Sequence, residues 1–417
     1  MDRIKAELIT IGDELLYGQT IDTNASFIGE KITEAGIELV YHTTVGDDSE
    51  TLLNAIAQAM KRVDIVLATG GLGPTHDDIT KKIICKYFRR QLVFHDSILK
   101  ELEDKYKAQG MVMPPINQNQ ALLPQGAKFF ENRIGSALGI LFRENSKIFI
   151  SMPGVPSEMK IMIKEQVLPY FKEKISGQIN IIHRKIRTIG IAESVIFEKV
   201  KNIIEEKSPV KIAFLPSFRG VDIRLTVKSD NEVKAREAIA EIERQFTEII
   251  GKYIFGCDND ELPDIIGKQL ADRGLTIAVA ESCTGGMLGN IFTAIPGSSD
   301  YFLGGVISYS NDIKIKILNV PALTIERHGA VSAETVKYMA EGVKKLTGAS
   351  IGAAITGIAG PTGGTPEKPV GLTYIGIAAE DSTKAKDFHY GKDRNQNRLR
   401  ACYSALDMVR RYLNDID

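Results

Sequence analysis

The pattern of apolar and polar residues in the first 170 positions alternates between strand-like and helix-like stretches. Strands are predicted for the short apolar runs 6–11, 37–45, 64–69 and 147–151. Helices are predicted where apolar residues recur at helical spacing, at 24–35, 50–62 and 80–88. Repeated strand–helix units predict a mostly parallel sheet with helices on both faces, and a ligand site beyond the carboxyl ends of its strands.

The pattern changes between about residues 170 and 255. The predicted elements there are strand 181–189, helix 192–206, strands 211–216 and 221–228, and helix 233–250. This βαββα order resembles the RNA-binding KH fold, but the G-x-x-G loop with which that fold clamps RNA is absent from the segment. We therefore expect a small α+β module and no nucleic-acid partner.

An α/β pattern returns after residue 262. The predicted elements are helix 262–273, strands 275–280, 305–309, 350–356 and 372–379, and a final helix at 395–413. The predicted fold class is therefore α/β, with two α/β domains of mostly parallel sheet joined by a KH-like α+β module. The predicted domains are 1–168, 169–257 and 258–417.

Composition and charge exclude several classes of protein. The 417 residues include 52 basic and 53 acidic side chains, a balance that gives no indication of a nucleic-acid or membrane surface. No apolar run has the length of a membrane span, and the first residues lack a signal-like apolar stretch, so we expect a cytoplasmic protein. The four cysteines are scattered without a C-x-x-C pair, which favours free thiols over disulfides or a zinc site.

Two polar motifs in the last segment indicate nucleophilic catalysis. Residues 280–286 place Ser282 between a predicted strand and a Gly-Gly pair that begins a helix, and residues 308–314 place Lys314 after another strand. A serine nucleophile needs a base to take its proton, and a desolvated lysine can be that base. The pair suggests amide or ester hydrolysis through an acyl-enzyme. A capping serine and a solvated lysine remain open as alternatives, and Cys283 is either a rival nucleophile or a small core residue.

Acidic and glycine residues gather at the predicted strand ends of the first segment. The candidate metal ligands are Asp13, Glu14, Asp22, Asp77, Asp78 and Glu158. Carboxylate oxygens suit a divalent cation, although acids are also common at solvated helix N-termini. Gly70, Gly71 and Gly73 would allow the backbone to approach a phosphate closely.

As a set, these motifs resemble the CinA family, the competence/damage-inducible proteins. Residues 12–18, 22–24, 70–78 and 153–159 are similar to its molybdopterin-binding-like domain, which is related to the MoaB/MogA fold. Residues 281–286, 309–314, 328–332 and 357–364 are similar to its PncC-type domain. The resemblance covers essentially the whole chain.

The resemblance implies two hydrolase activities. These are deamidation of nicotinamide mononucleotide by the C-terminal domain, without a cofactor, and cleavage of ADP-ribose by the N-terminal domain with a divalent metal. Family members differ in which activity is present. For the deamidase, Ser282 is the expected nucleophile and Lys314 the base, with Tyr309 orienting the lysine or relaying a proton.

The expected binding residues follow from the same motifs and from the chemistry of the substrates. Those for nicotinamide mononucleotide are Thr284, Gly285, Gly286, Thr356, Gly357, Arg394 and Arg398, the arginines serving the phosphate. Those for ADP-ribose are Asn24, Gly70, Gly71, Gly73 and Thr75. We expect a homodimer whose partners are small nucleotides. A nucleotide-binding protein without turnover and a molybdopterin-handling protein remain open as alternatives.

Overall fold

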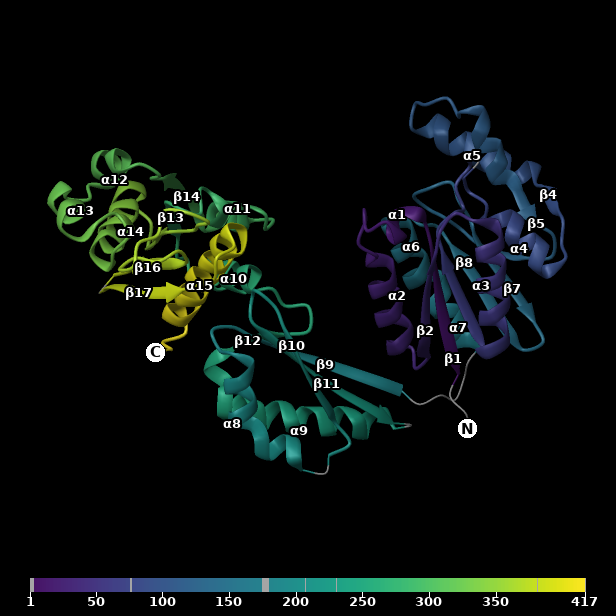
Figure 1. Ribbon diagram of the computed structural model, residues 1–417, viewed down its shortest axis with the longest axis horizontal. Coiled ribbons are helices and arrows are strands. Elements are labelled where there is room, and N and C mark those ends of the chain that lie inside the picture. The colour runs from purple at the N-terminus through teal and green to yellow at the C-terminus, as the bar shows by residue number, and fades with distance from the viewer. Residues whose placement is uncertain are drawn as a thin grey trace. The chain divides into compact units, whose positions relative to one another are not determined.

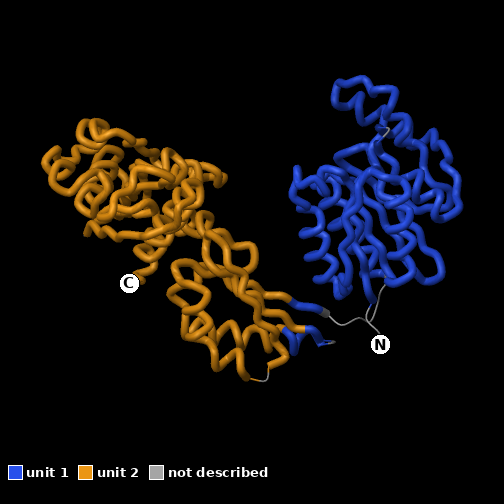
Figure 2. The backbone as a smooth tube through the Cα atoms, in the orientation of Figure 1, with its two compact units in different colours: residues 1–182, 228–235 blue, residues 183–227, 236–417 orange. Residues whose placement is uncertain are grey.

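The computed structural model describes residues 4–75, 77–174, 180–206, 208–229, 231–380 and 382–416. The chain divides into two compact units, Met1–Ile182 with Lys228–Ala235 and His183–Val227 with Arg236–Asp417 (Figure 2). The division into three domains at about residues 168 and 257 stays a prediction. In the described part of the chain, no helix has both the length and the apolar character needed to cross a membrane.

A six-stranded sheet forms the centre of the first unit, in the order β2-β1-β3-β8-β7-β6 (Figure 1). Its strands are β1 (Lys5–Ile11), β2 (Glu38–Val45), β3 (Ile65–Thr69), β6 (Lys128–Phe130), β7 (Gly139–Glu144) and β8 (Lys147–Met152). The first four in spatial order are parallel, and β7 and β6 are antiparallel. The predicted mostly parallel sheet is therefore confirmed.

Helices cover both faces of this sheet. One face carries α2 (Thr23–Glu34), α6 (Pro156–Met162) and α7 (Leu168–Lys174), and the other carries α3 (Ser49–Arg62) and α4 (Thr80–Phe88). Apolar side chains of β1 lie on both faces of the sheet, so helices must pack on each face to bury them. Ile9 and Ile11 pack into the α3–α4 cluster, and Ala6 and Leu8 pack into the α2–α6 cluster.

The chain is still helical at Pro169, the first residue of the second predicted domain. A π-helical turn, Ile163–Val167, joins α6 to α7 directly before this proline. A proline inside a helix removes a backbone hydrogen bond, and a local change of helical pitch accommodates that loss. The sequence prediction also lacked β6, β7, α6 and α7, together with α1 (Asp13–Leu16), β4 (Leu92–Phe94), α5 (Asp96–Ala108) and β5 (Leu122–Pro124).

The middle module has the predicted βαββα order with one additional strand. Its elements are β9 (Asn180–Thr188), α8 (Glu193–Glu205), β10 (Lys211–Pro216), β11 (Val221–Ser229), α9 (Glu232–Ile250) and β12 (Ile254–Cys257). The strands lie in the order β10-β11-β9-β12. On β11, buried and more exposed side chains alternate, as expected for a sheet with one covered face.

A five-stranded sheet, β14-β13-β15-β16-β17, forms the C-terminal part. Its strands are β13 (Ile277–Glu281), β14 (Phe302–Ile307), β15 (Ile351–Gly357), β16 (Leu372–Ala378) and β17 (Thr383–His389). The first three in spatial order are parallel and the last two antiparallel. Helix α14 (Ala333–Thr347) covers one face, and α10 (Leu262–Asp272) and α15 (Arg394–Leu413) cover the other.

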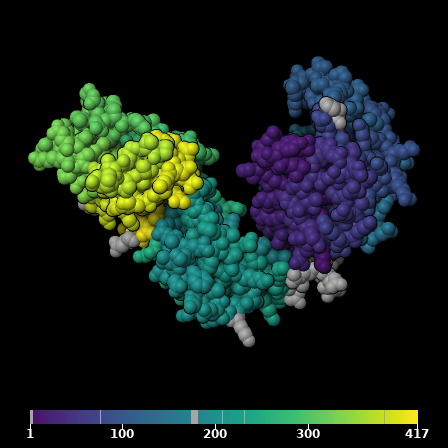
Figure 3. All heavy atoms as spheres, in the orientation of Figure 1, coloured from purple at the N-terminus to yellow at the C-terminus, as the bar shows by residue number. Residues whose placement is uncertain are grey.

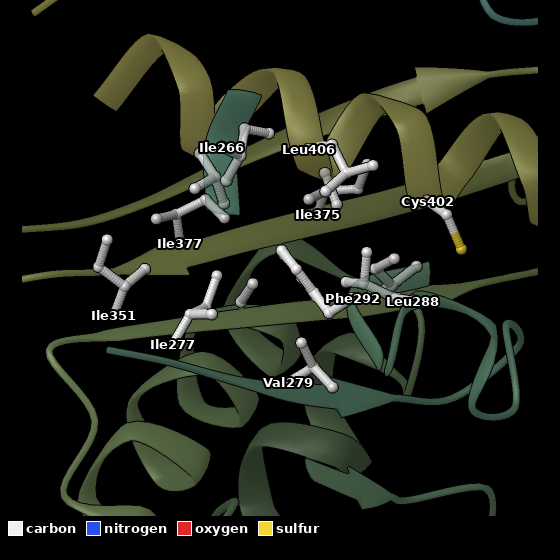
Figure 4. Packing of buried hydrophobic residues seen from close by; sticks show 14 of the residues in the cluster. Ile266, Ile277, Val279, Leu288, Phe292, Ile351, Ile375, Ile377, Cys402 and Leu406 are labelled. Carbon is white, nitrogen blue, oxygen red and sulfur yellow. The ribbon is translucent and has the colours of Figure 1, made fainter. Parts of the chain in front are cut away.

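Apolar side chains fasten α15 to this sheet. Cys402 and Leu406 of α15 face Ile375 and Ile377 of β16 in the buried cluster shown in Figure 4. The remaining helices are α11 (Met287–Thr293), α12 (Asn311–Leu318) and α13 (Ala322–His328). Helix α11 begins after the Gly-Gly pair, as predicted, and the sequence pattern predicted neither α12 nor α13. The strand predicted at 305–309 ends at Ile307, because Ser310 already caps α12 by accepting from the Ile313 N–H.

Candidate active site

The serine motif forms a tight turn between β13 and α11. The Ser282 N–H donates to the Ile355 carbonyl at 3.0 Å, which fixes the serine beside the end of β15. Gly285 and Gly286 have φ values of 60° and 94°, the left-handed region that favours glycine. Gly286, not Ser282, is the N-cap residue of α11, so the structure excludes the capping alternative for the serine.

Lys314 lies in the first turn of α12 and points into the protein. Its side chain is 1% exposed, which excludes the alternative of a solvated lysine. The Lys314 Nζ lies 3.2 Å from the Ser282 Oγ, 2.7 Å from the Ser308 carbonyl and 3.4 Å from the Tyr309 carbonyl. Burial lowers the pKa of Lys314 from its ordinary value of 10.5. The pair therefore has the contact and the desolvation that a serine–lysine couple needs.

Cys283 has a different environment from its neighbour. Its side chain is 8% exposed and belongs to the apolar cluster beneath α15, with Leu288 and Ala359. Burial raises the pKa of the Cys283 thiol to about 11. Because the thiolate is the nucleophilic form, a thiol with a raised pKa is poorly suited to attack a carbonyl near neutral pH.

Two arginines of α15 hold loops of the site, and Arg398 of these contacts the serine turn. The Arg398 Nη2 donates to the Thr284 carbonyl at 2.7 Å, and the Arg394 Nη1 donates to the Gly360 carbonyl at 2.8 Å. Among the described residues, the Arg398 Nε and the Thr284 Oγ1 are both buried without a hydrogen-bond partner. Such unsatisfied atoms are uncommon in folded proteins and suit a site that a polar ligand completes.

Three other predicted residues are engaged differently. The Tyr309 side chain is 62% exposed, and its hydroxyl lies 3.4 Å from the Arg394 Nη2, so only its backbone carbonyl contacts Lys314. The Thr356 hydroxyl donates to the Ala330 carbonyl at 2.8 Å. Gly357 is paired with Thr373 of β16 and so belongs to the sheet ladder.

Glu281 organises the turn, although no role was predicted for it. Its carboxylate is 1% exposed and accepts the N–H groups of Gly286, Leu288 and Gly289 at 3.0, 3.1 and 2.8 Å. The first N–H groups of a helix have no partner within the helix, and this carboxylate supplies one. A carboxylate that ends an otherwise apolar buried strand was the signal in the sequence that could have identified it.

The predicted nucleotide-binding residues of the first unit also gather at strand ends. A side chain at Gly70 would come within 2.2 Å of the Ile11 carbonyl, so only glycine fits this turn. The Asn24 Nδ2 donates to the Gly154 carbonyl at 2.7 Å. In the described part of the chain, the Asn24 Oδ1 and the Asp22 Oδ2 are buried without a hydrogen-bond partner. Gly71, Gly73 and Thr75 lie on the same turn as Gly70.

Three of the six predicted metal ligands accept hydrogen bonds from backbone N–H groups or from a side chain of the protein itself. Asp78 accepts from the N–H groups of Gly73 and Thr75 at 2.7 and 2.9 Å. Asp22 caps α2 by accepting from the Ala25 N–H at 2.8 Å. Glu158 accepts from the Asn132 Nδ2 at 2.6 Å.

The other three acidic residues, Asp13, Glu14 and Asp77, lie near Asp47, which was not among the predicted metal ligands. Asp13 and Asp47 exchange hydrogen bonds between backbone N–H and carboxylate at 3.1 and 3.2 Å. Burial raises the pKa of Asp47, and the negative charges of Asp13, Glu14 and Asp77 raise it further. Among the described residues, however, no three His, Cys, Asp or Glu side chains are gathered closely enough to hold a metal ion. The six predicted residues do not form one preassembled ligand set.

Together, the fold and the site define a modular α/β protein with a buried serine–lysine pair in its C-terminal sheet. Three family profiles match successive parts of the chain. They are the probable molybdopterin binding domain at residues 7–173, the damage-inducible protein CinA KH domain at 183–256 and the CinA C-terminal domain at 259–413.

Relatives extend the match to the full length. The chain is 42% identical to a CinA-like protein of Kosmotoga olearia, over 98% of this chain and 99% of that one. It is 41% identical to a CinA-like protein of Cytophaga hutchinsonii, over 99% of both. A solved structure of the competence/damage inducible protein CihA from Agrobacterium tumefaciens is 38% identical, covers 37% of this chain and 93% of its own, and gives a TM-score of 0.36. The chain belongs to the CinA family.

Proposed function

We propose that the C-terminal part of the chain hydrolyses the carboxamide of nicotinamide mononucleotide. The observation that carries this proposal is the buried Lys314 amine, 3.2 Å from the Ser282 hydroxyl. The family resemblance supplies the substrate, and the two arginines of α15 supply cationic groups for its phosphate. Arginine suits phosphate because its planar fork of donors matches the oxygen geometry.

The reaction would proceed through an ester on Ser282. The Ser282 Oγ attacks the carboxamide carbon while its proton passes to the neutral Lys314 amine. The tetrahedral intermediate collapses, the C–N bond breaks, and the departing ammonia takes the proton back from Lys314. Water then attacks the ester with the same lysine as base, which releases nicotinate mononucleotide and restores the serine. The backbone N–H groups of Cys283 and Thr284, which follow Ser282 in the turn, would stabilise the oxyanion.

The rate should depend on pH through the charge of Lys314. Only the neutral amine can accept the serine proton, and burial lowers the pKa of this group below its ordinary 10.5. We therefore expect kcat/KM for ammonia release to rise with pH and to reach half its maximum below pH 10.5. A profile that falls or stays flat as pH increases through the neutral and alkaline range would contradict the assignment of Lys314 as base.

We propose a second activity for the N-terminal domain, cleavage of ADP-ribose with a divalent cation. The glycine turn at residues 70–73, the unsatisfied Asn24 Oδ1 and the mutual repulsion among Asp13, Glu14, Asp47 and Asp77 support a site for phosphate and cation. We derive no catalytic step through a metal, because the described carboxylates form no preassembled ligand set. Bound pterin in the purified protein would favour molybdopterin handling instead.

Asp77→Asn should abolish metal-dependent ADP-ribose hydrolysis, because it removes a negative charge from the group of carboxylates around Asp47. The domain should stay folded, because Asp77 is exposed. Phosphate release from ADP-ribose, coupled to a phosphatase, measures this in the presence of each divalent ion. Asp104→Asn on the exposed face of α5 is the matched control and should keep full activity. Full activity in the Asp77 variant, or none in the wild type with any ion, would overturn the proposal.

A further inference from the structure

A cavity of about 860 Å³ lies between the middle module and the C-terminal sheet, both within the second unit. Its walls come from the loop Ser217–Val221, from β17 and from α15. In Figure 3 the yellow surface of the last residues meets the teal surface of the middle module. The volume falls in the range of small-molecule sites, and it is large enough for a dinucleotide.

The α15 residues in this cavity form one face of the helix. They are Arg400, Tyr403, Ser404, Asp407, Met408, Arg411 and Tyr412, which recur at spacings of three and four residues. The arginines assigned to the serine site, Arg394 and Arg398, lie nearer the N-terminal end of the same helix. The cavity is therefore separate from the serine–lysine site, although one helix serves both.

The charge of the lining is strongly positive. Five of its side chains are arginine or lysine, namely Arg219, Lys384, Lys386, Arg400 and Arg411. Its one carboxylate, Asp407, already pairs with Arg410 and Arg411 at 2.7 and 2.8 Å. Arg219 pairs with Glu261 at 2.9 Å. Within the described residues, Lys384, Lys386 and Arg400 form no ion pair, so the cavity keeps uncompensated positive charge that an anion would neutralise.

Aromatic rings line the same space. The rings of Phe218 and Tyr403 meet edge to face at 6.0 Å, and Arg219 lies over both at 5.3 and 5.5 Å. At the end of β17, the rings of Phe388 and Tyr390 are stacked at 6.0 Å, and the Tyr390 hydroxyl donates to the Ser404 Oγ at 2.7 Å. Rings of this kind pack on flat heteroaromatic groups, and the cations beside them suit phosphate.

We propose that this cavity is a second ligand site, which takes a phosphorylated nucleotide of dinucleotide size. The positive charge of Arg400, Lys384 and Lys386 binds the phosphates, and the rings of Phe218 and Tyr403 pack on a base. The site is independent of deamidation, because it contains neither Ser282 nor Lys314.

Hydrogen–deuterium exchange of the full chain, with and without NAD⁺ as the probe, tests the proposal. NAD⁺ should slow exchange in peptides that contain Ser217–Val221 and β17. Arg400→Gln should raise the NAD⁺ concentration that gives half of this protection by about tenfold or more, since a charge-assisted contact is lost. Arg224→Gln, an exposed arginine on β11 outside the cavity, is the matched control and should leave it unchanged.

Lys384→Gln provides a second variant if Arg400→Gln fails to fold, which its thermal unfolding midpoint would reveal. It lies exposed on β17 and should weaken the protection in the same way. Absence of protection in these peptides, or protection that neither variant weakens, would overturn the proposal. Equal protection by inorganic phosphate at the same concentration would also contradict it, because the aromatic walls would then have no role.

Discussion

Ser282→Ala and Lys314→Ala should each lower kcat for ammonia release from nicotinamide mononucleotide by at least about a thousandfold. The serine hydroxyl and the lysine amine are in contact, and neither can form the ester without the other. The double variant should be little slower than either single variant, since groups that act as one unit do not lose rate additively. A coupled glutamate dehydrogenase assay measures the ammonia.

Cys283→Ala is the matched control for this series. It removes the adjacent side chain of similar size, whose thiol has a pKa raised to about 11 by burial. We expect it to keep most of the activity. If this variant is inactive and Ser282→Ala is fully active, the nucleophile is Cys283 and not Ser282. The proposed deamidase reaction would still stand.

Glu281→Leu should both destabilise the C-terminal part and lower kcat by about a hundredfold or more. The substitution leaves three backbone N–H groups without this acceptor, of which that of Leu288 is buried and the other two are partly buried. A fully buried group left unpaired costs about 1–3 kcal/mol, and a partly buried one costs less. Because Glu281 directly precedes Ser282, a turn that loses these bonds no longer holds the hydroxyl against Lys314. Denaturant unfolding gives the stability, and ammonia release well below the transition gives kcat.

Glu326→Gln, at an exposed position of α13, is the control and should change neither quantity. A Glu281→Leu variant that is unfolded would be uninformative about kcat, so Glu281→Gln is measured beside it. The amide keeps one acceptor oxygen, so a smaller loss of stability and of rate is expected. Normal kcat in a folded variant of either kind would show that the carboxylate does not position the serine.

Much of the fold could be predicted from the sequence, because the spacing of apolar residues and the positions of helix-capping residues indicate the same elements. Helix α4 has the predicted bounds Thr80–Phe88, and α3 starts where Asp48 accepts from the Thr51 N–H. The start of α11 was predicted from its Gly-Gly pair, but α12 and α13 were not, because each has only seven or eight residues and too few apolar positions to establish a period. Proline is typical of a turn or a helix end, but Pro169 lies in the first turn of α7, shortly after a π-helical turn.

The candidate site was predictable where the motif itself sets the geometry. Ser282 and Lys314 come from different strand ends, and a parallel sheet brings such ends to one edge. What the sequence could not supply is the direction of each side chain. Tyr309 turns its hydroxyl toward Arg394, and Asp78 turns inward to hold its own loop, so neither matches the role expected from its position.

Partition of the reaction with hydroxylamine tests the central proposal most directly. If a Ser282 ester forms, hydroxylamine should compete with water for it, so the hydroxamate of nicotinate mononucleotide should appear in proportion to the hydroxylamine added. If formation of the ester limits the rate, ammonia release by the full-length protein should not change as hydroxylamine is added. The Ser282→Ala variant should form neither ammonia nor hydroxamate. Failure of the wild-type protein to release ammonia from nicotinamide mononucleotide, or ammonia release with no hydroxamate at any hydroxylamine concentration, would contradict the proposed acyl-enzyme.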